Sequence, residues 1–282
     1  MDPKINDLTL IAKPHIDKIN QEVTRIIQKD CGNLIKKYPK YKQAFRVAPI
    51  FESRIFLIID GIINLVTEDN LYGSKILLRS LIDHTVKLNY LIHRALEDKN
   101  DRIFKEYLLF SDLAEELQYL KELNYKSKII NEVDIDEKAL KDLIKRKPEI
   151  KKYSNNQIFE KSNQFGFRNM FKYINEEREK NHLEFDNEDI KAGFEAFLHI
   201  SALYSDLSSF IHGGPAADKF VLLMHLDKEE HDNEVIEIVE QIMALNFYAC
   251  IVFIGFCNKL ENKYDSFIRR IIKCQIEYYK KI

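Results

Sequence analysis

The chain has 282 residues, and its 43 Lys and Arg residues nearly balance its 45 Asp and Glu residues, giving a formal net charge of −2. With 45% hydrophobic and 31% charged residues, the composition is that of a globular protein rather than a disordered chain. Only 8 Gly and 6 Pro residues are present, too few for the many turns of a sandwich, a barrel or a doubly wound sheet. The near-neutral charge also excludes a protein that is basic over its whole surface.

The sequence predicts an all-α fold, because apolar residues recur every three or four positions along most of the chain. Gly and Asn after Cys31 should end the first helix, and Gly213-Gly214-Pro215 is a strong signal for the end of a later one. No proline occurs between Pro49 and Pro148, so long helices are possible there. The expected helices cover about 5–29, 49–66, 74–97, 101–123, 187–212, 233–260 and 265–279.

Residues 124–187 differ in composition from the rest of the chain. They are rich in Lys, Asn and Glu and hold only short apolar clusters. This pattern predicts an inserted polar segment of short helices, either packed on the side of a bundle or acting as a mobile lid. We therefore expect one helical domain over residues 1–282, a multi-helix bundle with this insertion.

Cysteine usage and hydropathy predict a cytoplasmic protein with no membrane partner. The cysteines lack the spacing of a zinc site or a redox pair, so we expect buried, reduced thiols. The N-terminus has no apolar signal segment. The most apolar stretch, residues 247–257, is shorter than the roughly 20 residues needed to span a bilayer. The four cysteines are Cys31, Cys250, Cys257 and Cys274.

Two charged residues stand out in the expected helix 74–97, which is the first candidate for a functional site. Arg79 and Asp83 are four residues apart in an apolar stretch of the expected helix 74–97, so they share one face. One interpretation is an ion pair within the helix. The other is that the pair points into the protein, where the Arg79 guanidinium could bind a phosphate or a carboxylate in bidentate fashion.

A second segment carries a polar stripe. At about 100° per residue, Tyr204, Ser208 and His212 fall within about 80° of one another, and His212 lies in the last turn before the double glycine. His212 either caps the exposed carbonyl groups of the helix end or serves as an acid or base.

Together, the Arg-x-x-x-Asp helix and the later Tyr-x-x-x-Ser-x-x-x-His-Gly helix end resemble a family of all-helical bacterial proteins of unknown function. That family is similar to the HEPN superfamily of nucleotide-binding and RNA-cleaving helical domains, whose ribonucleases carry Arg-x(4–6)-His near a helix end. His212-Gly213 matches the end of that motif, whereas Asp206 and Ser208 stand where its Arg is expected; Arg79 and His84 also have the required spacing. The resemblance implies a metal-independent endoribonuclease of a toxin–antitoxin or phage-defence system, commonly a homodimer.

We therefore expect a composite site across two packed helices. Arg79 would stabilise negative charge on phosphorus, and Asp83 would hold Arg79 in place. His212 would act as base toward a ribose 2′-hydroxyl or as acid toward the leaving oxygen. Tyr204 and Ser208 would orient the phosphate. No metal or other cofactor is expected, since the chain has no Walker pattern, glycine-rich phosphate loop or clear cluster of metal ligands.

The expected partner is RNA or a nucleotide. Two basic stretches could bind it, although the Lys-rich composition favours a solvated surface for each. They contain Lys36, Lys37, Lys40 and Lys42 in the first, and Lys145, Arg146 and Lys147 in the second. The alternative function is a non-catalytic helical interaction protein, a sensor or antitoxin-like partner, in which Arg79, Asp83, Tyr204 and His212 form a buried structural network. An exposed Arg–His pair beside basic surface would favour the enzyme, and a closed network the alternative.

Overall fold

The computed structural model describes residues 3–111, 113, 116, 119–120, 135–181, 200–226 and 228–281. All regular structure in these residues is helical, which confirms the all-α prediction. The elements are α1 (Pro3–Lys29), α2 (Cys31–Lys37), η1 (Pro39–Tyr41), α3 (Ala44–Thr67), α4 (Leu71–Glu97), α5 (Arg102–Phe110), α7 (Ile135–Arg146), η2 (Pro148–Lys152), α8 (Asn155–Asn163), α9 (Phe167–Asn181), α11 (Ile200–His212), α12 (Pro215–Leu226), α13 (Lys228–Leu260) and α14 (Asp265–Tyr279).

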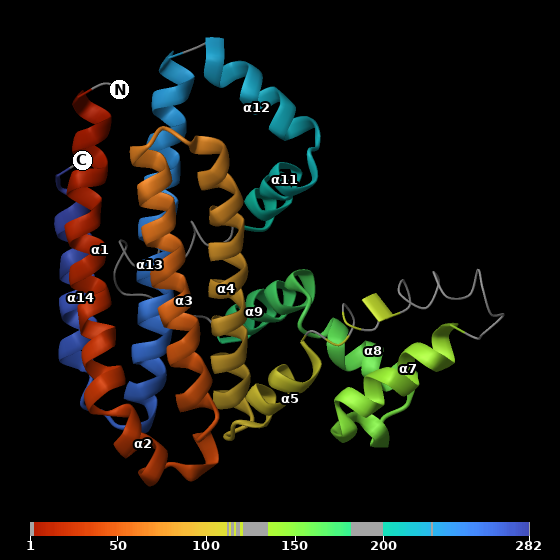
Figure 1. Ribbon diagram of the computed structural model, residues 1–282. Coiled ribbons are helices and arrows are strands. Elements are labelled where there is room, and N and C mark those ends of the chain that lie inside the picture. The colour runs from red at the N-terminus through yellow and green to blue at the C-terminus, as the bar shows by residue number, and fades with distance from the viewer. Residues whose placement is uncertain are drawn as a thin grey trace.

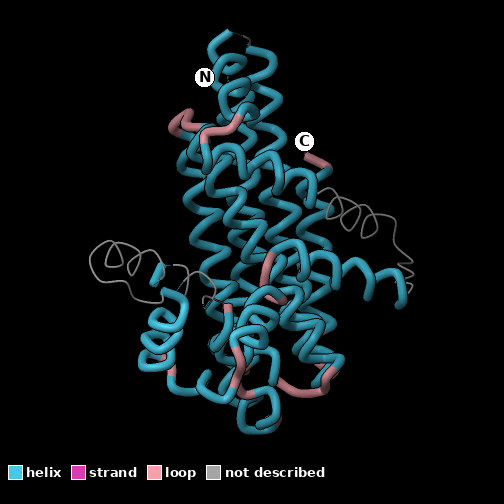
Figure 2. The backbone as a smooth tube through the Cα atoms, turned by 90° about the vertical axis from the view of Figure 1, so that its right-hand side faces the viewer, coloured by secondary structure: helices cyan, strands magenta, loops and turns pink. Residues whose placement is uncertain are grey.

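Five long helices, α1, α3, α4, α13 and α14, form a bundle (Figure 1). Helix α3 packs along α4, α13 contacts α1, α3 and α4, and α14 packs on α1 and α13. The shorter helices α9 and α11 lie on the side of α4, and Figure 2 shows the same arrangement turned by 90°. Helices α1, α3, α4 and α13 each bury an apolar stripe made mainly of aliphatic and aromatic side chains, as the sequence periodicity predicts, and α14 buries Ile271, Cys274 and Tyr278.

Helix α13 is longer than the sequence analysis predicts. It begins at Lys228 rather than near residue 233, because the acidic residues Glu229 and Glu230 lie in its first turn, where they complement the helix dipole. Its length and apolar composition satisfy the criteria for a membrane span, so the shortness of the run 247–257 does not exclude one. However, 67% of its most apolar window is buried within the bundle, which is typical of the core helix of a soluble protein.

Other boundaries also differ from prediction. Cys31, Gly32 and Asn33 begin α2 rather than end the first helix. Helix α5 covers only the first part of the expected helix 101–123. The prediction that the cysteines are buried and unpaired is confirmed for all four.

A tight turn joins α3 to α4 and sets where α4 begins. Asp69 adopts a left-handed backbone conformation, with φ of 61°. The Asn70 side chain then caps α4 by accepting a hydrogen bond of 2.9 Å from the backbone N–H of Gly73. Because α4 starts directly after this cap, Arg79 lies in its third turn, beside α11.

The described part of the predicted insertion, residues 135–181, consists of α7, η2, α8 and α9. Helix α9 packs on α4 and α8 packs on α5, so this part matches the prediction of short helices on the side of the bundle. Residues 124–134 and 182–187 of the insertion, like residues 187–199 of the next predicted helix, lie outside the described residues. One domain over residues 1–282 and a lid function stay predictions.

Asp101 joins the loop before α3 to the end of α4. Its side chain is buried and accepts a hydrogen bond of 2.6 Å from the backbone N–H of Gln43, while its own N–H donates to the Lys40 carbonyl. Asp101→Ala leaves the Gln43 N–H without its partner, so we expect a loss of about 2 kcal/mol in the free energy of unfolding. Urea unfolding measures this loss. Lys105→Ala removes only the exposed partner of Asp101; an equal loss in both variants would contradict the prediction.

Candidate functional site

The end of α11 confirms the predicted stop signal. Gly213 has a φ of +64°, and the N–H of Gly214 donates to the Ser209 carbonyl over 2.8 Å. These features are those of a Schellman cap, for which glycine is suited because it tolerates positive φ. Pro215 then begins α12. His212 is therefore the last residue of α11.

Helix α11 packs against the first half of α4. The Tyr72 hydroxyl of α4 donates to the Phe210 carbonyl over 2.8 Å, and the two rings lie 5.4 Å apart. This contact fixes the register between the two helices. One result is that the stripe of Tyr204 and Ser208 faces Arg79.

Arg79 is held across the interface by both hydroxyls. Its Nε donates to the Ser208 Oγ over 3.0 Å, and its Nη2 donates to the Tyr204 hydroxyl oxygen over 3.0 Å. Ser208 in turn donates to the Tyr204 carbonyl, leaving its lone pairs for Arg79. The guanidinium carbon also lies 4.6 Å from the centre of the Tyr204 ring. The predicted meeting of Arg79, Tyr204 and Ser208 is thus present in the structure.

The other face of the Tyr204 ring is covered by Phe167, the first residue of α9. The two rings are nearly parallel, with centroids 3.6 Å apart and an interplanar angle of 5°. Burial raises the pKa of the Tyr204 hydroxyl, the nearby Asp83 carboxylate raises it further, and Arg79 and Lys87 oppose the rise. Tyr204 therefore stays protonated at neutral pH, and its hydroxyl can accept a bond from Arg79 while donating another.

Asp83 does not hold Arg79, contrary to the predicted role and to the predicted ion pair within the helix. Its carboxylate pairs with Lys87, at 2.5 Å. The reason is geometric: Arg79 turns toward α11, where two hydroxyls accept its protons. In addition, an acid four residues before a base is the favoured order on a helix, which Asp83–Lys87 satisfies and Arg79–Asp83 reverses.

His212 is exposed at the end of α11, and no hydrogen bond or ion pair of its side chain is found in the described part of the chain. It lies one turn beyond Ser208, which corresponds to about 6 Å along the helix axis and about 40° around it. His84, the other histidine with motif spacing, instead faces Phe51 and contacts the Ser80 carbonyl. The exposed imidazole on the helix that binds Arg79 is thus that of His212.

A family model matches residues 50–233, or 184 of the 282 residues. The chain belongs to the DUF5677 family, a family of unknown function. The region matched by DUF5677 contains all of α4, α9 and α11, so every contact of the Arg79 site lies within the family region. No curated protein and no solved structure matches the chain. The description of DUF5677 names no activity, so the likeness to HEPN proteins stays a prediction.

The two predicted RNA-binding stretches lie apart from the Arg79 site. Lys40 contacts Asp101, beyond the end of α4, and Arg79 is about 27 Å from that end along the helix axis. Lys36 and Lys42 are exposed. Lys37, however, pairs with Glu261 at 2.6 Å.

The second stretch is partly neutralised by nearby carboxylates. Lys145 lies 3.4 Å from Asp142, and Arg146 and Lys147 lie 3.6 and 2.9 Å from Glu116. Lys145 and Arg146 remain exposed on α7, and Figure 1 shows this helix well away from α4 and α11. A role for either stretch in RNA binding stays a prediction.

Sequence reasoning missed Phe167 and Lys87. Phe167 stood out only as part of a short apolar cluster, whose role as one wall of the site depends on how α9 crosses α4. Lys87 carried a local signal, because it lies four residues after Asp83 on the same helix face.

Proposed function

We propose that this DUF5677 protein is a HEPN-like, metal-independent endoribonuclease of the cytoplasm, acting in a toxin–antitoxin or phage-defence system. The observation that carries the proposal is the state of Arg79. Its guanidinium is half-buried and oriented by two neutral hydroxyls, and within the described residues no carboxylate forms an ion pair with it. A positioned cation without a carboxylate partner is suited to an anionic ligand, and RNA presents phosphates.

The remaining donors of Arg79 support phosphate binding. Bonds to Ser208 and Tyr204 use Nε and one N–H of Nη2, which leaves Nη1 and the other N–H of Nη2 for two phosphate oxygens. Because the guanidinium is held before the ligand arrives, little reorganisation accompanies binding. In the reaction this arrangement stabilises the charge that develops on the phosphorus oxygens.

The proposed reaction is an intramolecular transesterification of the RNA backbone. The 2′-hydroxyl attacks phosphorus and the bond to the 5′ oxygen breaks, giving a 2′,3′-cyclic phosphate and a 5′-hydroxyl end. His212 takes the proton of the 2′-hydroxyl, and its imidazolium then protonates the departing 5′ oxygen. Its exposure and its place one turn beyond Ser208 support this role.

Cleavage of a labelled single-stranded RNA tests the proposal. We expect products with cyclic phosphate ends in the presence of EDTA, and a loss of about hundredfold in rate for His212→Gln and for Arg79→Lys. Lysine keeps the charge but not the bidentate geometry. His231→Gln is a matched control, because His231 contacts Asp69 instead. Unchanged cleavage by the His212 variant would rule out its catalytic role.

The alternative is a non-catalytic interaction protein, a sensor or antitoxin-like partner. It is favoured by the stack of Arg79, Tyr204 and Phe167, which resembles a closed structural network. In that case the wild type cleaves no RNA, and Arg79→Lys lowers stability instead. Either function is compatible with a homo-oligomer or another protein partner, and light scattering of the purified chain measures the former.

A further inference from the structure

Helix α9 connects the Arg79 site to a polar network at the far end of α4. Its first residue, Phe167, stacks on Tyr204 of α11. Six residues later, Tyr173 donates a hydrogen bond of 2.6 Å to Glu97 in the last turn of α4. The same short helix therefore contacts both the site and the end of α4, so its position affects both.

The stack with Phe167 helps determine where the Tyr204 hydroxyl lies. Phe167 is 9% exposed and contacts Tyr204 on the face opposite Arg79. The ring of Tyr204 is thus confined between a cation and a second ring, and rotation about its side-chain bonds is restricted. Without Phe167 the ring gains freedom, and the hydroxyl no longer accepts steadily from Nη2 of Arg79.

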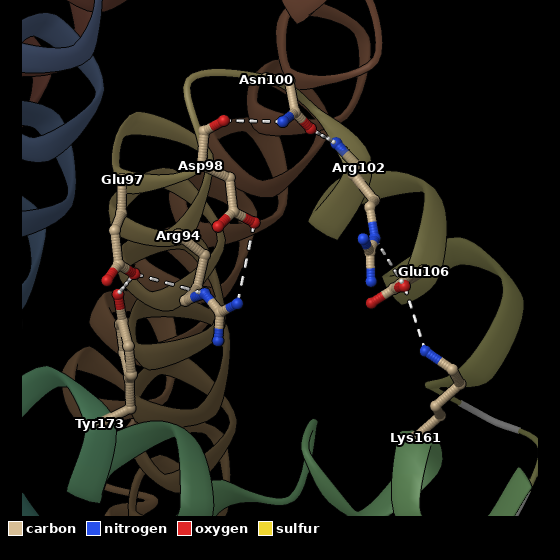
Figure 3. A network of polar contacts seen from close by, with 8 residues as sticks. All are labelled: Arg94, Glu97, Asp98, Asn100, Arg102, Glu106, Lys161 and Tyr173. Carbon is tan, nitrogen blue, oxygen red and sulfur yellow. Dashed lines mark hydrogen bonds and ion pairs between the residues drawn. The ribbon is translucent and has the colours of Figure 1, made fainter. Parts of the chain in front are cut away.

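The network in Figure 3 attaches α9 to α4. Arg94 lies over the Tyr173 ring, 5.2 Å from its centre, and approaches Glu97 and Asp98 within 3.6 and 3.7 Å. Tyr90 adds an edge-to-face contact with Tyr173 at 5.2 Å. Because the charged groups are partly exposed, their attraction is weak and is screened by salt.

Glu106 attaches the neighbouring helix α8 in a similar way. It accepts hydrogen bonds of 3.1 Å from Arg102 and from Lys161 of α8 (Figure 3). Burial alone would raise the pKa of Glu106, but these two bonds bring it below its ordinary value. The carboxylate therefore stays ionised at neutral pH, and α8 remains paired to α5.

We propose that the docking of α9 on α4 controls the affinity of the Arg79 site for phosphate, with Phe167 as a positioning residue. Docked α9 holds Tyr204 so that the Arg79 guanidinium is oriented for the anion. Loosened α9 leaves Arg79 mobile and lowers affinity. The inference rests on the proposed function for the choice of phosphate as ligand, while its effect on Arg79 is measurable without RNA.

The test follows the Nε–H resonance of Arg79 in nitrogen-15 spectra, assigned by its loss in Arg79→Lys, during titration with inorganic phosphate. We expect Phe167→Ala to speed solvent exchange of this proton and to raise the Kd for phosphate about fivefold. Tyr173→Phe, which removes only the hydroxyl bound to Glu97, should raise it about threefold. Phe167→Tyr keeps the ring stack and should stay within about twofold of the wild type.

Lys172→Ala is the matched control, because Lys172 lies on the exposed side of α9 and contacts only Glu176 of the same helix in the described chain. Thermal unfolding checks each variant. If Phe167→Ala fails to fold, Tyr173→Phe decides, since it creates no cavity. An unchanged resonance and Kd in Phe167→Ala and Tyr173→Phe, or no phosphate binding by the wild type, overturns the inference. If the wild type cleaves no RNA but the Kd for phosphate still rises in the α9 variants, the result supports the inference and rejects only the ribonuclease.

Discussion

Glu52→Gln should raise the free energy of unfolding by about 3 kcal/mol at pH 7 and about 5 kcal/mol above pH 8. Glu52 lies on α3 and is fully buried, and neither of its carboxyl oxygens has a hydrogen-bond partner in the described chain. Burial raises the pKa of this carboxyl to about 8. The folded protein therefore keeps Glu52 protonated at neutral pH, whereas the unfolded chain ionises it.

The direction of the pH effect follows from this difference. An exposed carboxyl in the unfolded chain has a pKa near 4.5, so the stability linked to the Glu52 proton is fully present below pH 4.5. Between pH 4.5 and 8 the unfolded chain releases the proton and the folded protein retains it, so stability falls by about 1.4 kcal/mol per pH unit. The loss is complete once the pH passes the folded pKa.

Urea unfolding of the wild type and of Glu52→Gln between pH 5 and 8.5 measures this slope by difference. The difference is needed because burial lowers the pKa of His84, which reduces stability below pH 6.5 in both proteins. This window lies above the titration of Glu106, whose lowered pKa removes stability only as the pH falls below 4.5. It also lies below the titration of the Cys250 and Cys257 thiols, which face the same core and whose pKa values are raised by burial. Glu68→Gln, at the exposed C-cap of α3, should keep the wild-type slope. A wild-type slope in Glu52→Gln would disprove the assignment.

Glu234→Gln should have the opposite effect, a loss of about 3 kcal/mol in the free energy of unfolding. Lys75 of α4 is 5% exposed, and its ammonium pairs with the Glu234 carboxylate of α13. It also lies 5.6 Å from the centre of the Phe220 ring of α12. Glutamine removes the negative charge and leaves a buried ammonium without its counter-ion.

A double variant separates the cost of the unpaired Lys75 charge from the other effects of replacing Glu234. Lys75→Met in the Glu234→Gln background removes the stranded charge, so we expect it to recover most of the lost stability. Thermal and urea unfolding of the two single variants and the double variant measure the coupling. If the double variant is no more stable than Glu234→Gln, the ion pair does not determine the stability of this interface.

Glu52 and Lys75 illustrate which features the sequence predicts and which it does not. The apolar periodicity of α3 and α4 predicted both helices, and the neighbours Ala48, Ile55 and Ile59 place Glu52 on the buried stripe. Nothing local predicts that Lys75 meets Glu234, because that contact depends on how α4 and α13 are rotated against each other.

In the candidate site, too, the features within one helix were predictable, and those that depend on packing between helices were not. The spacing of Tyr204 and Ser208 predicted one helical stripe, and their meeting with Arg79 was expected and is found. The partner of Asp83 was predicted wrongly, because two acceptors on another helix compete for Arg79. The stacking of Phe167 could not be predicted, since its segment lacks long periodicity and its position depends on tertiary packing.

The buried thiols of α13 can report transient opening of the bundle core. Cys250 and Cys257 lie in the centre of the bundle, and burial raises the pKa of each thiol well above its usual value. Thiolates attack alkylating reagents, so these side chains react only when the helices around them separate and the thiols can ionise. The rate of alkylation in native buffer therefore tracks the opening of the bundle core itself.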